Sequence, residues 1–143
     1  MEFVTASGYL FELGGCFSFE APPVAWQRKF DIVAAAISDA MAGVRPGMRA
    51  GALVDIIRRR YERENLAITG RRLWDFHGQG MHSLMRPYGL PNSSDVVEDS
   101  TMINIHPGIL TKDGLGISAT NNFIVTPDGG RALGGFRHVW HVV

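Results

Sequence analysis

Apolar residues recur every three or four positions in the segment that follows Pro22-Pro23. This spacing puts them on one face of a helix, as expected for an amphipathic helix that packs against a core. The pattern stops at Gly43 and Pro46-Gly47, because glycine and proline commonly terminate helices. The apolar face consists of Trp26, Phe30, Val33, Ile37 and Met41.

A second helix is predicted from about residue 50 to residue 64, again with a single apolar face. That face is formed by Leu53, Val54, Ile57 and Tyr61. The run Arg58-Arg59-Arg60 falls near the carboxyl end of this helix, where positive charge complements the helix dipole. We therefore interpret the run as a solvated helix end and not as a phosphate or nucleic-acid site.

Beyond Gly70 the helical period disappears, and short apolar segments separated by Gly, Pro, Asn and Asp predict strands. Residues 127–130, Pro-Asp-Gly-Gly, predict a tight turn between two of them. Residues 88–99 are polar, contain Pro91 and predict a surface loop. The predicted strands are residues 74–82, 102–106, 122–126, 132–136 and 139–142.

Ahead of the helices, residues 9–19 are rich in aromatic and apolar residues around Gly14-Gly15. They predict one strand, a tight turn or bulge, and a second strand. Two consecutive helices that cover a curved, mainly antiparallel sheet make an α+β arrangement. Because the chain has no repeat, low-complexity segment or linker, we expect residues 1–143 to form a single domain.

The composition narrows the functional classes. Fourteen Lys and Arg residues balance fourteen Asp and Glu residues, so we expect no nucleic-acid partner and no attraction to an acidic membrane. The single cysteine, Cys16, excludes an intrachain disulfide and a cysteine-based zinc site. No apolar run approaches the ~18 residues of a membrane span, and no signal peptide pattern is present. The sequence therefore predicts a cytoplasmic protein.

Two histidines occur in short apolar segments next to glycine: His77 in residues 76–82 and His106 in residues 104–108. Glycine allows a ligand or another backbone to approach closely, and imidazole titrates nearest to neutral pH. We expect both rings to line a pocket, although a histidine buried in a sheet against a carbonyl would give the same pattern. His82 is a further candidate for ligand binding, but strand alternation from His77 places it on the opposite face unless Gly80 introduces a bulge.

The other candidate site residues are less specific. Glu12 lies between two apolar residues, where a carboxylate is costly unless it is exposed or paired, so it is a candidate site carboxylate. Thr120, Asn121 and Asn122 are candidates for substrate binding. The two asparagines fit a turn or bulge equally well.

The order of several motifs resembles the creatinase/aminopeptidase, or pita-bread, superfamily, and in particular the carboxyl-terminal half of its Xaa-Pro-peptidase and creatinase members. The resemblance implies a half pita-bread fold in which about half of the domain is missing upstream. The motifs are Met41-Ala42-Gly43-Val44-Arg45-Pro46-Gly47, His77-Gly78-Gln79-Gly80, Asn104-Ile105-His106-Pro107-Gly108 and Ile124-Val125-Thr126.

Peptidases of that superfamily hold two metal ions with two aspartates, one histidine and two glutamates. Carried over by position, only the histidine is retained, as His77, while Glu12 takes the place of the first aspartate. The second aspartate falls within residues 22–24, which contain no acid. His106 and the pair Thr120-Asn121 replace the glutamates. The resemblance therefore implies that the carboxylate-bridged metal pair is lost, and we expect no metal and no other cofactor.

The leading hypothesis is a C–N hydrolase of the creatinase/Xaa-Pro-peptidase type that acts on an amide or amidine in a small molecule or peptide. In it His77 is the acid/base, and His106 and Glu12 orient or polarise the substrate. A catalytically inactive pita-bread module that binds a ligand or peptide remains an alternative, as does a fragment of a longer metallopeptidase-like enzyme. Since half of a pita-bread exposes a sheet edge and apolar surface, we expect a homodimer.

Overall fold

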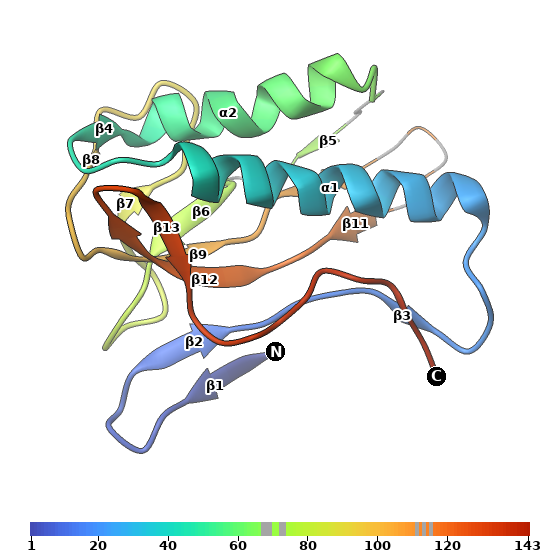
Figure 1. Cartoon of the computed structure of the whole chain (residues 1–143), viewed down its shortest axis with the longest axis horizontal. Helices are drawn as coiled ribbons and strands as arrows, with labels where there is room; N and C mark the ends of the chain where they lie inside the picture. The colour runs from blue at the N-terminus through green and yellow to red at the C-terminus, as the bar shows by residue number, and fades with distance from the viewer. Residues whose placement is uncertain (67–69, 72–73, 111, 113, 115) are drawn as a thin grey trace.

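The computed structural model describes residues 1–66, 70–71, 74–110, 112, 114 and 116–143. Helices α1 (Val24–Gly43) and α2 (Ala50–Arg63) lie side by side over one face of the main sheet (Figure 1). The amino-terminal strands and the carboxyl-terminal segment lie on its other side. The predicted α+β arrangement and both helices are confirmed, with α1 starting two residues before Trp26.

The main sheet has five antiparallel strands in the order β13-β12-β9-β6-β7. Smaller sheets pair β1 with β2, β3 with β14, β4 with β8, and β10 with both β5 and β11. The main strands are β6 (Phe76–Gly78), β7 (Met85–Tyr88), β9 (Met102–Ile105), β12 (Asn121–Thr126) and β13 (Gly129–Ala132). The others are β1 (Glu2–Val4), β2 (Leu10–Glu12), β3 (Phe17–Ser18), β4 (Met48–Arg49), β5 (Gly70–Arg71), β8 (Val96–Val97), β10 (Gly108–Leu110), β11 (Gly116–Ser118) and β14 (His141–Val142).

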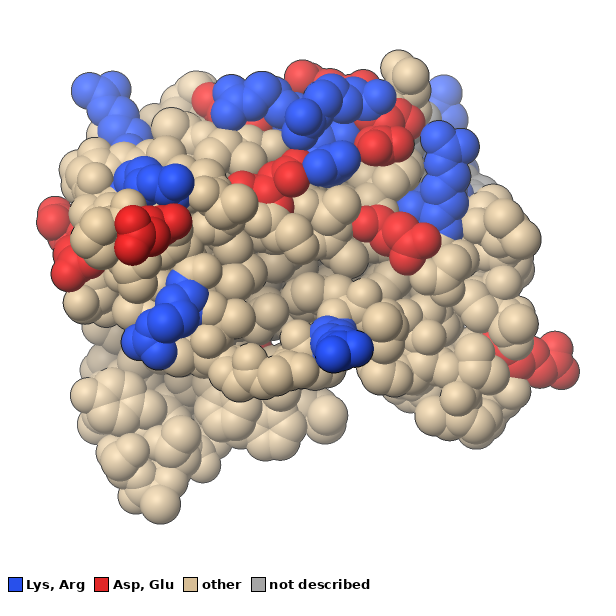
Figure 2. Space-filling model, in the orientation of Figure 1, with Lys and Arg blue, Asp and Glu red and all other residues tan. Residues whose placement is uncertain are grey.

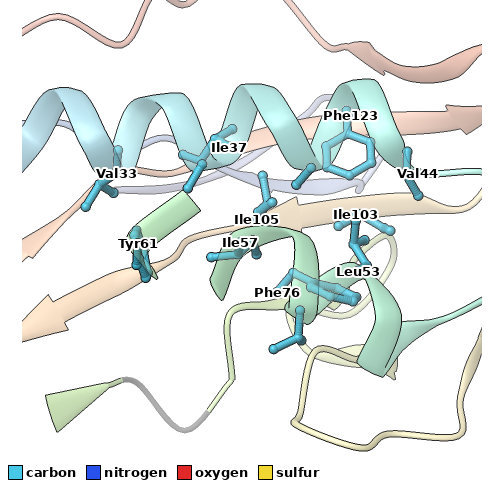
Figure 3. Close-up of a cluster of buried hydrophobic side chains, with 14 of the residues drawn as sticks. Val33, Ile37, Val44, Leu53, Ile57, Tyr61, Phe76, Ile103, Ile105 and Phe123 are labelled. Atoms are coloured by element: carbon cyan, nitrogen blue, oxygen red, sulfur yellow. The ribbon is translucent and has the colours of Figure 1, made fainter. Parts of the chain in front are cut away.

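The hydrophobic core lies between the helices and one face of this sheet (Figure 3). The helices contribute the apolar faces predicted from their periodicity, except for Trp26, which is exposed in the first turn of α1. The sheet contributes Phe76, Ile103, Ile105 and Phe123. Phe76 pairs with Ile105 and Ile103 with Phe123, so these four form one continuous apolar surface. Each fully buried side chain of this size stabilises the fold by about 1.5–3 kcal/mol. The face turned away from the helices is therefore free to carry polar residues.

The predicted turn at residues 127–130 is confirmed. Strands β12 and β13 form a hairpin in which Thr126 pairs with Gly129, leaving Pro127 and Asp128 at the tip. Gly129 has φ +130°, a conformation that other residues rarely adopt. Because β13 begins within this turn, the strand predicted at residues 132–136 is wrong: pairing ends at Ala132. The strand predicted at residues 139–142 is reduced to β14.

Two other strand predictions need correction. Strands β2 and β3 do not pair with each other as residues 9–19 suggested, because β2 pairs with β1, and β3 pairs in parallel with β14. The strand predicted at residues 74–82 is only β6, after which the chain bends at residues 80–84 and returns as β7. Part of the loop predicted at residues 88–99 pairs as β8 with β4.

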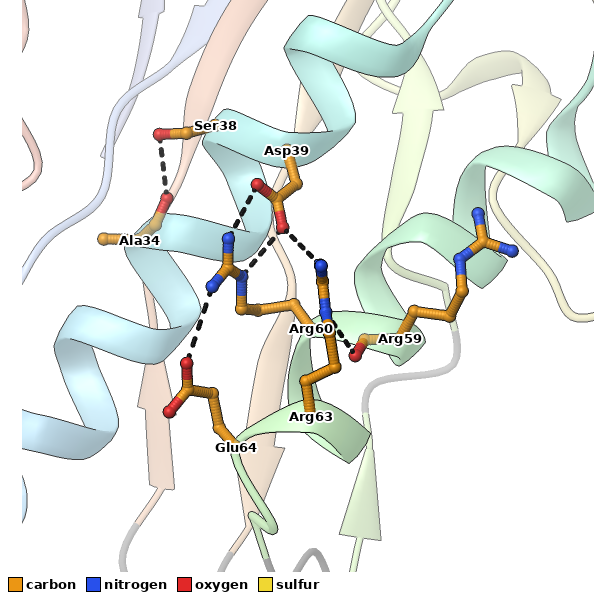
Figure 4. A network of polar contacts seen from close by, with 7 residues as sticks. All are labelled: Ala34, Ser38, Asp39, Arg59, Arg60, Arg63 and Glu64. Carbon is orange, nitrogen blue, oxygen red and sulfur yellow. Dashed lines mark hydrogen bonds and ion pairs between the residues drawn. The ribbon is translucent and has the colours of Figure 1, made fainter.

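The arginine run lies where the carboxyl half of α2 faces α1 (Figure 4). Arg60 forms a two-point ion pair with Asp39 of α1 through Nε (2.7 Å) and Nη2 (2.9 Å), and Arg63 adds a contact of 3.1 Å. The Arg60 hydrogen bond holds the pKa of Asp39 below its usual range. Arg60 and Arg63 thus join the two helices through Asp39, a role that was not predicted from the sequence.

In the described part of the chain, no helix is both long enough and apolar enough to cross a membrane.

Candidate functional site

Two histidines on neighbouring strands form the centre of the candidate site. His77 lies in β6 and His106 directly follows β9; both are buried, with 3% of each residue exposed. The ring centroids are 4.9 Å apart and the rings are tilted by 54°. The structure therefore brings together two residues that are 29 positions apart in the printed sequence.

The contacts of His77 define which ring nitrogen holds the proton. Its Nδ1 lies 2.9 Å from the carbonyl oxygen of Gly78, which can only accept a hydrogen bond, so Nδ1 is the donor. Its Nε2 faces Oε1 of Glu12 at 3.7 Å. In the neutral ring, Nε2 therefore carries the free lone pair and faces the Glu12 carboxylate.

Glu12 is held in place from two sides. Its backbone N–H donates to Oδ1 of Asn122 (3.4 Å), and its carbonyl accepts a hydrogen bond from Nδ2 of the same side chain. Its carboxylate accepts a hydrogen bond from Nε2 of Gln79 (3.4 Å). The Glu12 carboxylate is thus paired, because β2 crosses the sheet face that carries His77 and Asn122.

A cavity of about 420 Å³ opens beside the histidine pair. Both histidines and Glu12 line it, so these three candidate residues share one cavity. The remaining walls come from Glu2, Trp74, Ser83 and Leu84, none of which is among the predicted site residues.

A row of polar side chains crosses the sheet beneath Glu12. Asn104 of β9 pairs with His77 on one side and with Asn122 of β12 on the other, so all three side chains point to the face opposite the helices. Asn104 is fully buried, and neither of its amide atoms has a hydrogen-bond partner in the described part of the chain. Neither Asn104 nor Gln79 is among the site residues predicted from the sequence. The available signal for Asn104 was its place as the one polar residue in the apolar segment Met102–Ile105.

The four residues proposed to bind substrate do not line this cavity. His82 is exposed in the bend after β6, and Thr120 is used in a backbone bridge with Gly14. The Asn121 amide lies 3.2 Å from Nε2 of His138, whose pKa is lowered by burial. The Asn122 side-chain amide forms hydrogen bonds with the main chain of Glu12. Thr120, Asn121 and Asn122 therefore lie close to the site as parts of its framework, while His82 lies apart from it.

A second cavity, of about 510 Å³, lies on the other side of β2. Its walls are mainly apolar and come from the β1–β2 hairpin and the segment after β13, with Leu10, Phe11, Leu13, Leu133 and Phe136 among them. Asn122 also reaches this cavity. Strand β2 thus separates the polar cavity lined by Glu12 from the apolar cavity lined by Leu10 and Phe11.

The residues do not fit the pair of divalent ions that the resemblance would imply. Among the described residues, no group of three or more His, Cys, Asp and Glu side chains is arranged to hold a metal ion. Hard divalent ions prefer several carboxylate oxygens, whereas the buried polar row supplies amides and an imidazole, and Glu2 and Glu12 are the only carboxylates among the described residues that line the cavity. The only cysteine, Cys16, lies elsewhere, and burial raises the pKa of its thiol.

Comparisons with known proteins agree with this fold. A dipeptidase from Mycobacterium ulcerans (PepE) superposes with a TM-score of 0.86 at 21% identity, covering 99% of this chain and 38% of that one. An X-Pro aminopeptidase from Thermotoga maritima gives a TM-score of 0.86 at 18% identity, covering 95% and 38%. A methionine aminopeptidase from Rickettsia prowazekii gives a TM-score of 0.71 at 18% identity, covering 88% and 59%.

The chain thus spans 38% of the length of the first two structures. The comparison with curated proteins finds no match. Residues 3–127 match the sequence model of metallopeptidase family M24. Because this match covers both helices, β6, β9 and β12, and therefore every residue of the His77–His106–Glu12 cluster, the chain belongs to metallopeptidase family M24.

Proposed function

We propose that this peptidase-like protein hydrolyses a C–N bond in a small amide, amidine or peptide without the two-metal centre. The observation that carries the proposal is the contact between His77 Nε2 and Glu12 Oε1, with the His106 ring beside it in the same cavity. A buried imidazole next to a carboxylate is a common acid/base arrangement.

In the proposed reaction, water adds to the carbon of the C–N bond while His77 takes a proton at Nε2. Glu12 stabilises the resulting imidazolium. The same proton then passes from Nε2 to the departing nitrogen, the C–N bond breaks, and His77 returns to its neutral form. His106 orients or polarises the substrate from the adjacent strand. Every atom of the water ends in the products, so no other reactant is required.

The test is direct product analysis. Purified protein is incubated with an Xaa-Pro dipeptide, a small amide and a small amidine, and the products are identified by mass spectrometry. We expect turnover of at least one substrate in the unchanged protein and a loss of about 100-fold or more in His77→Ala, as expected for loss of a general acid/base. His82→Ala is the matched control, since His82 is exposed and does not line the cavity.

Binding without turnover in the unchanged protein would contradict the hydrolase proposal and favour the inactive binding module. The orphaned amide of Asn104 and the replacement of metal-binding carboxylates by Thr120 and Asn121 support that alternative. Because the chain spans 38% of the first two structures, a fragment of a longer enzyme is the remaining alternative.

We also propose that the chain forms a homodimer. Phe17 and Phe19 are 71% and 83% exposed, beside the open two-stranded sheet β3–β14. In the space-filling view, few charged side chains lie over this lower part of the molecule, while both signs gather over the helices (Figure 2). Exposed apolar patches and open strand edges favour association. A cytoplasmic location remains part of the proposal, supported by the free Cys16.

A further inference from the structure

The apolar cavity, which lies across β2 from the cavity beside the histidine pair, has walls suited to a ligand without charge. Its volume of about 510 Å³ falls within the range of about 300–1,000 Å³ that is usual for small-molecule sites. Among the described residues, none of those that line it carries a charge. Because an unpaired charge is costly to bury, these walls disfavour an ionic ligand.

The polar side chains in these walls are already paired within the chain. The hydroxyl oxygens of Thr5 and Ser7 lie 3.0 Å apart, and Thr5 Oγ1 also accepts a hydrogen bond from the N–H of Tyr9 (3.0 Å). Both atoms of the Asn122 amide bind the main chain of Glu12. The affinity of a ligand in this cavity must therefore come mainly from the burial of apolar surface.

Two aromatic rings of the walls are held by neighbours outside the cavity. Phe11 of β2 stacks on Phe3 with ring centroids 5.0 Å apart, and Phe136 packs edge-on against His138 at 5.4 Å. Rings that are already fixed lose little conformational freedom when a ligand binds. Aromatic rings also prefer offset or edge-to-face contacts with a further ring, so these walls favour an aromatic ligand.

The segment after β13 leaves space beside its backbone. Gly134 and Gly135 both line the cavity, and a Cβ added at either position would meet no atom within 4 Å. Glycine therefore allows a flat ring to lie directly against this backbone. The proposed dimer surface is separate from the cavity, because Phe17 and Phe19 do not line it and β3 lies well away from the β1–β2 hairpin (Figure 1).

We infer that this cavity binds a small uncharged aromatic molecule. Phe11 and Phe136 contact its ring, and Leu10 and Leu133 add apolar surface from the two sides of the cavity. The site is distinct from the cavity that His77 lines, so the inference goes beyond the proposed hydrolysis and does not depend on it. The ligand contacts the strand that carries Glu12, so the backbone amides of β2 report its binding.

The test is equilibrium binding of three probes that share a naphthalene ring and differ in charge: naphthylmethanol, naphthylmethylammonium and naphthoate. Binding is followed by NMR of the backbone amides of β2 and of residues 133–136. We expect naphthylmethanol to bind about tenfold more tightly than either ion, because the ions must bury a charge. Leu133→Asn weakens its binding several-fold. Leu84→Asn, the same change in the cavity that His77 lines, leaves it unchanged.

Equal affinity for the three probes, or no binding of naphthylmethanol at about 1 mM, would overturn the inference. Nuclear Overhauser contacts place the ring in the unchanged protein, so the test remains decisive if Leu133→Asn fails to fold. Contacts with the methyl groups of Leu10 and Leu133 support the inference, and contacts with Leu84 instead would overturn it. Light scattering adds a further check: a dimer that dissociates as naphthylmethanol binds would show that a second copy of the chain is the natural occupant. None of these measurements needs turnover, so they leave the hydrolase proposal to its own assay.

Discussion

Asn122 holds the main chain of Glu12 through both atoms of its side-chain amide. The backbone of β12 is already paired with β9 and β13, so it cannot form a ladder with β2 as well. The Asn122 amide takes the place of a backbone peptide, accepting from the Glu12 N–H and donating to the Glu12 carbonyl. It therefore fixes where β2 crosses the sheet and, with it, where the Glu12 carboxylate meets His77.

Replacing Asn122 with alanine should displace Glu12. We expect the free energy of unfolding to fall by about 1–3 kcal/mol, because two hydrogen bonds are lost and partly buried backbone groups are left unpaired. Denaturant unfolding measures this loss, and the Glu12 amide resonance reports the local change. Asn121→Ala is the comparison variant, since its amide contacts His138 and the backbone N–H of Asn122 but not Glu12. An unchanged Glu12 resonance in Asn122→Ala would show that the clamp does not position β2.

His77→Ala should abolish ligand binding or turnover with little effect on folding. The imidazole makes few polar contacts, to the Gly78 carbonyl and Glu12, so we expect a stability loss of at most about 1–2 kcal/mol. Thermal unfolding and the product assay are measured on the same preparation. A variant that no longer folds would indicate a structural histidine, and His106→Ala would then have to carry the functional test.

The protein should not bind two divalent ions tightly. Only Glu12 among the residues around the histidine pair supplies a carboxylate at a position that matches a family metal ligand, and amides are poor replacements. Metal analysis after purification without chelator, followed by manganese titration calorimetry, is the measurement. Two equivalents bound with micromolar or tighter affinity would contradict the metal-free proposal.

Light scattering at tens of micromolar should give the mass of a dimer. The aromatic residues outside the helices that could form the dimer contact include Phe11, Phe17, Phe19, Trp74 and Trp140. In the structure, Phe11 stacks on Phe3 at 5.0 Å and Trp140 packs on Phe30 at 5.7 Å, so these two are already used within the chain. Phe17→Ser with Phe19→Ser should therefore give monomers, while Val24→Ser, also exposed, should not. A monomeric unchanged protein would contradict the dimer.

Asp39→Asn should destabilise the protein at neutral pH and have little effect in acid. The pKa of Asp39 is lowered in the folded state, so its stabilising effect is complete above the ordinary carboxyl pKa of about 3.9 and is lost as the pH falls through the lower folded value. Urea midpoints compared from pH 7 to pH 2 measure this, with Glu62→Gln as the control. A difference between Asp39→Asn and the unchanged protein that persists at the lowest pH would exclude the ion pair as its cause.

The sequence by itself determined the elements whose signals are local. Apolar spacing predicts both helices and most of the apolar face that each turns to the core, since a helix repeats every 3.6 residues whatever its partners are. Pro127 to Gly130 predict the β12–β13 turn, because the required conformations belong to those residues. The motifs around His77 and His106 were enough to identify the superfamily.

Only the tertiary structure decided which residues surround those histidines. Glu2 reaches the cavity because β1 pairs with β2, and the bend after β6 brings Ser83 and Leu84 to the cavity but leaves the His82 side chain exposed. Asn104 and Gln79 stand out only in the structure, where both amide atoms of Asn104 and Oε1 of Gln79 are buried without a hydrogen-bond partner among the described residues. Strand pairing and burial depend on contacts between residues far apart in sequence, such as Glu12 and Asn122, and no local pattern encodes which distant partner is chosen.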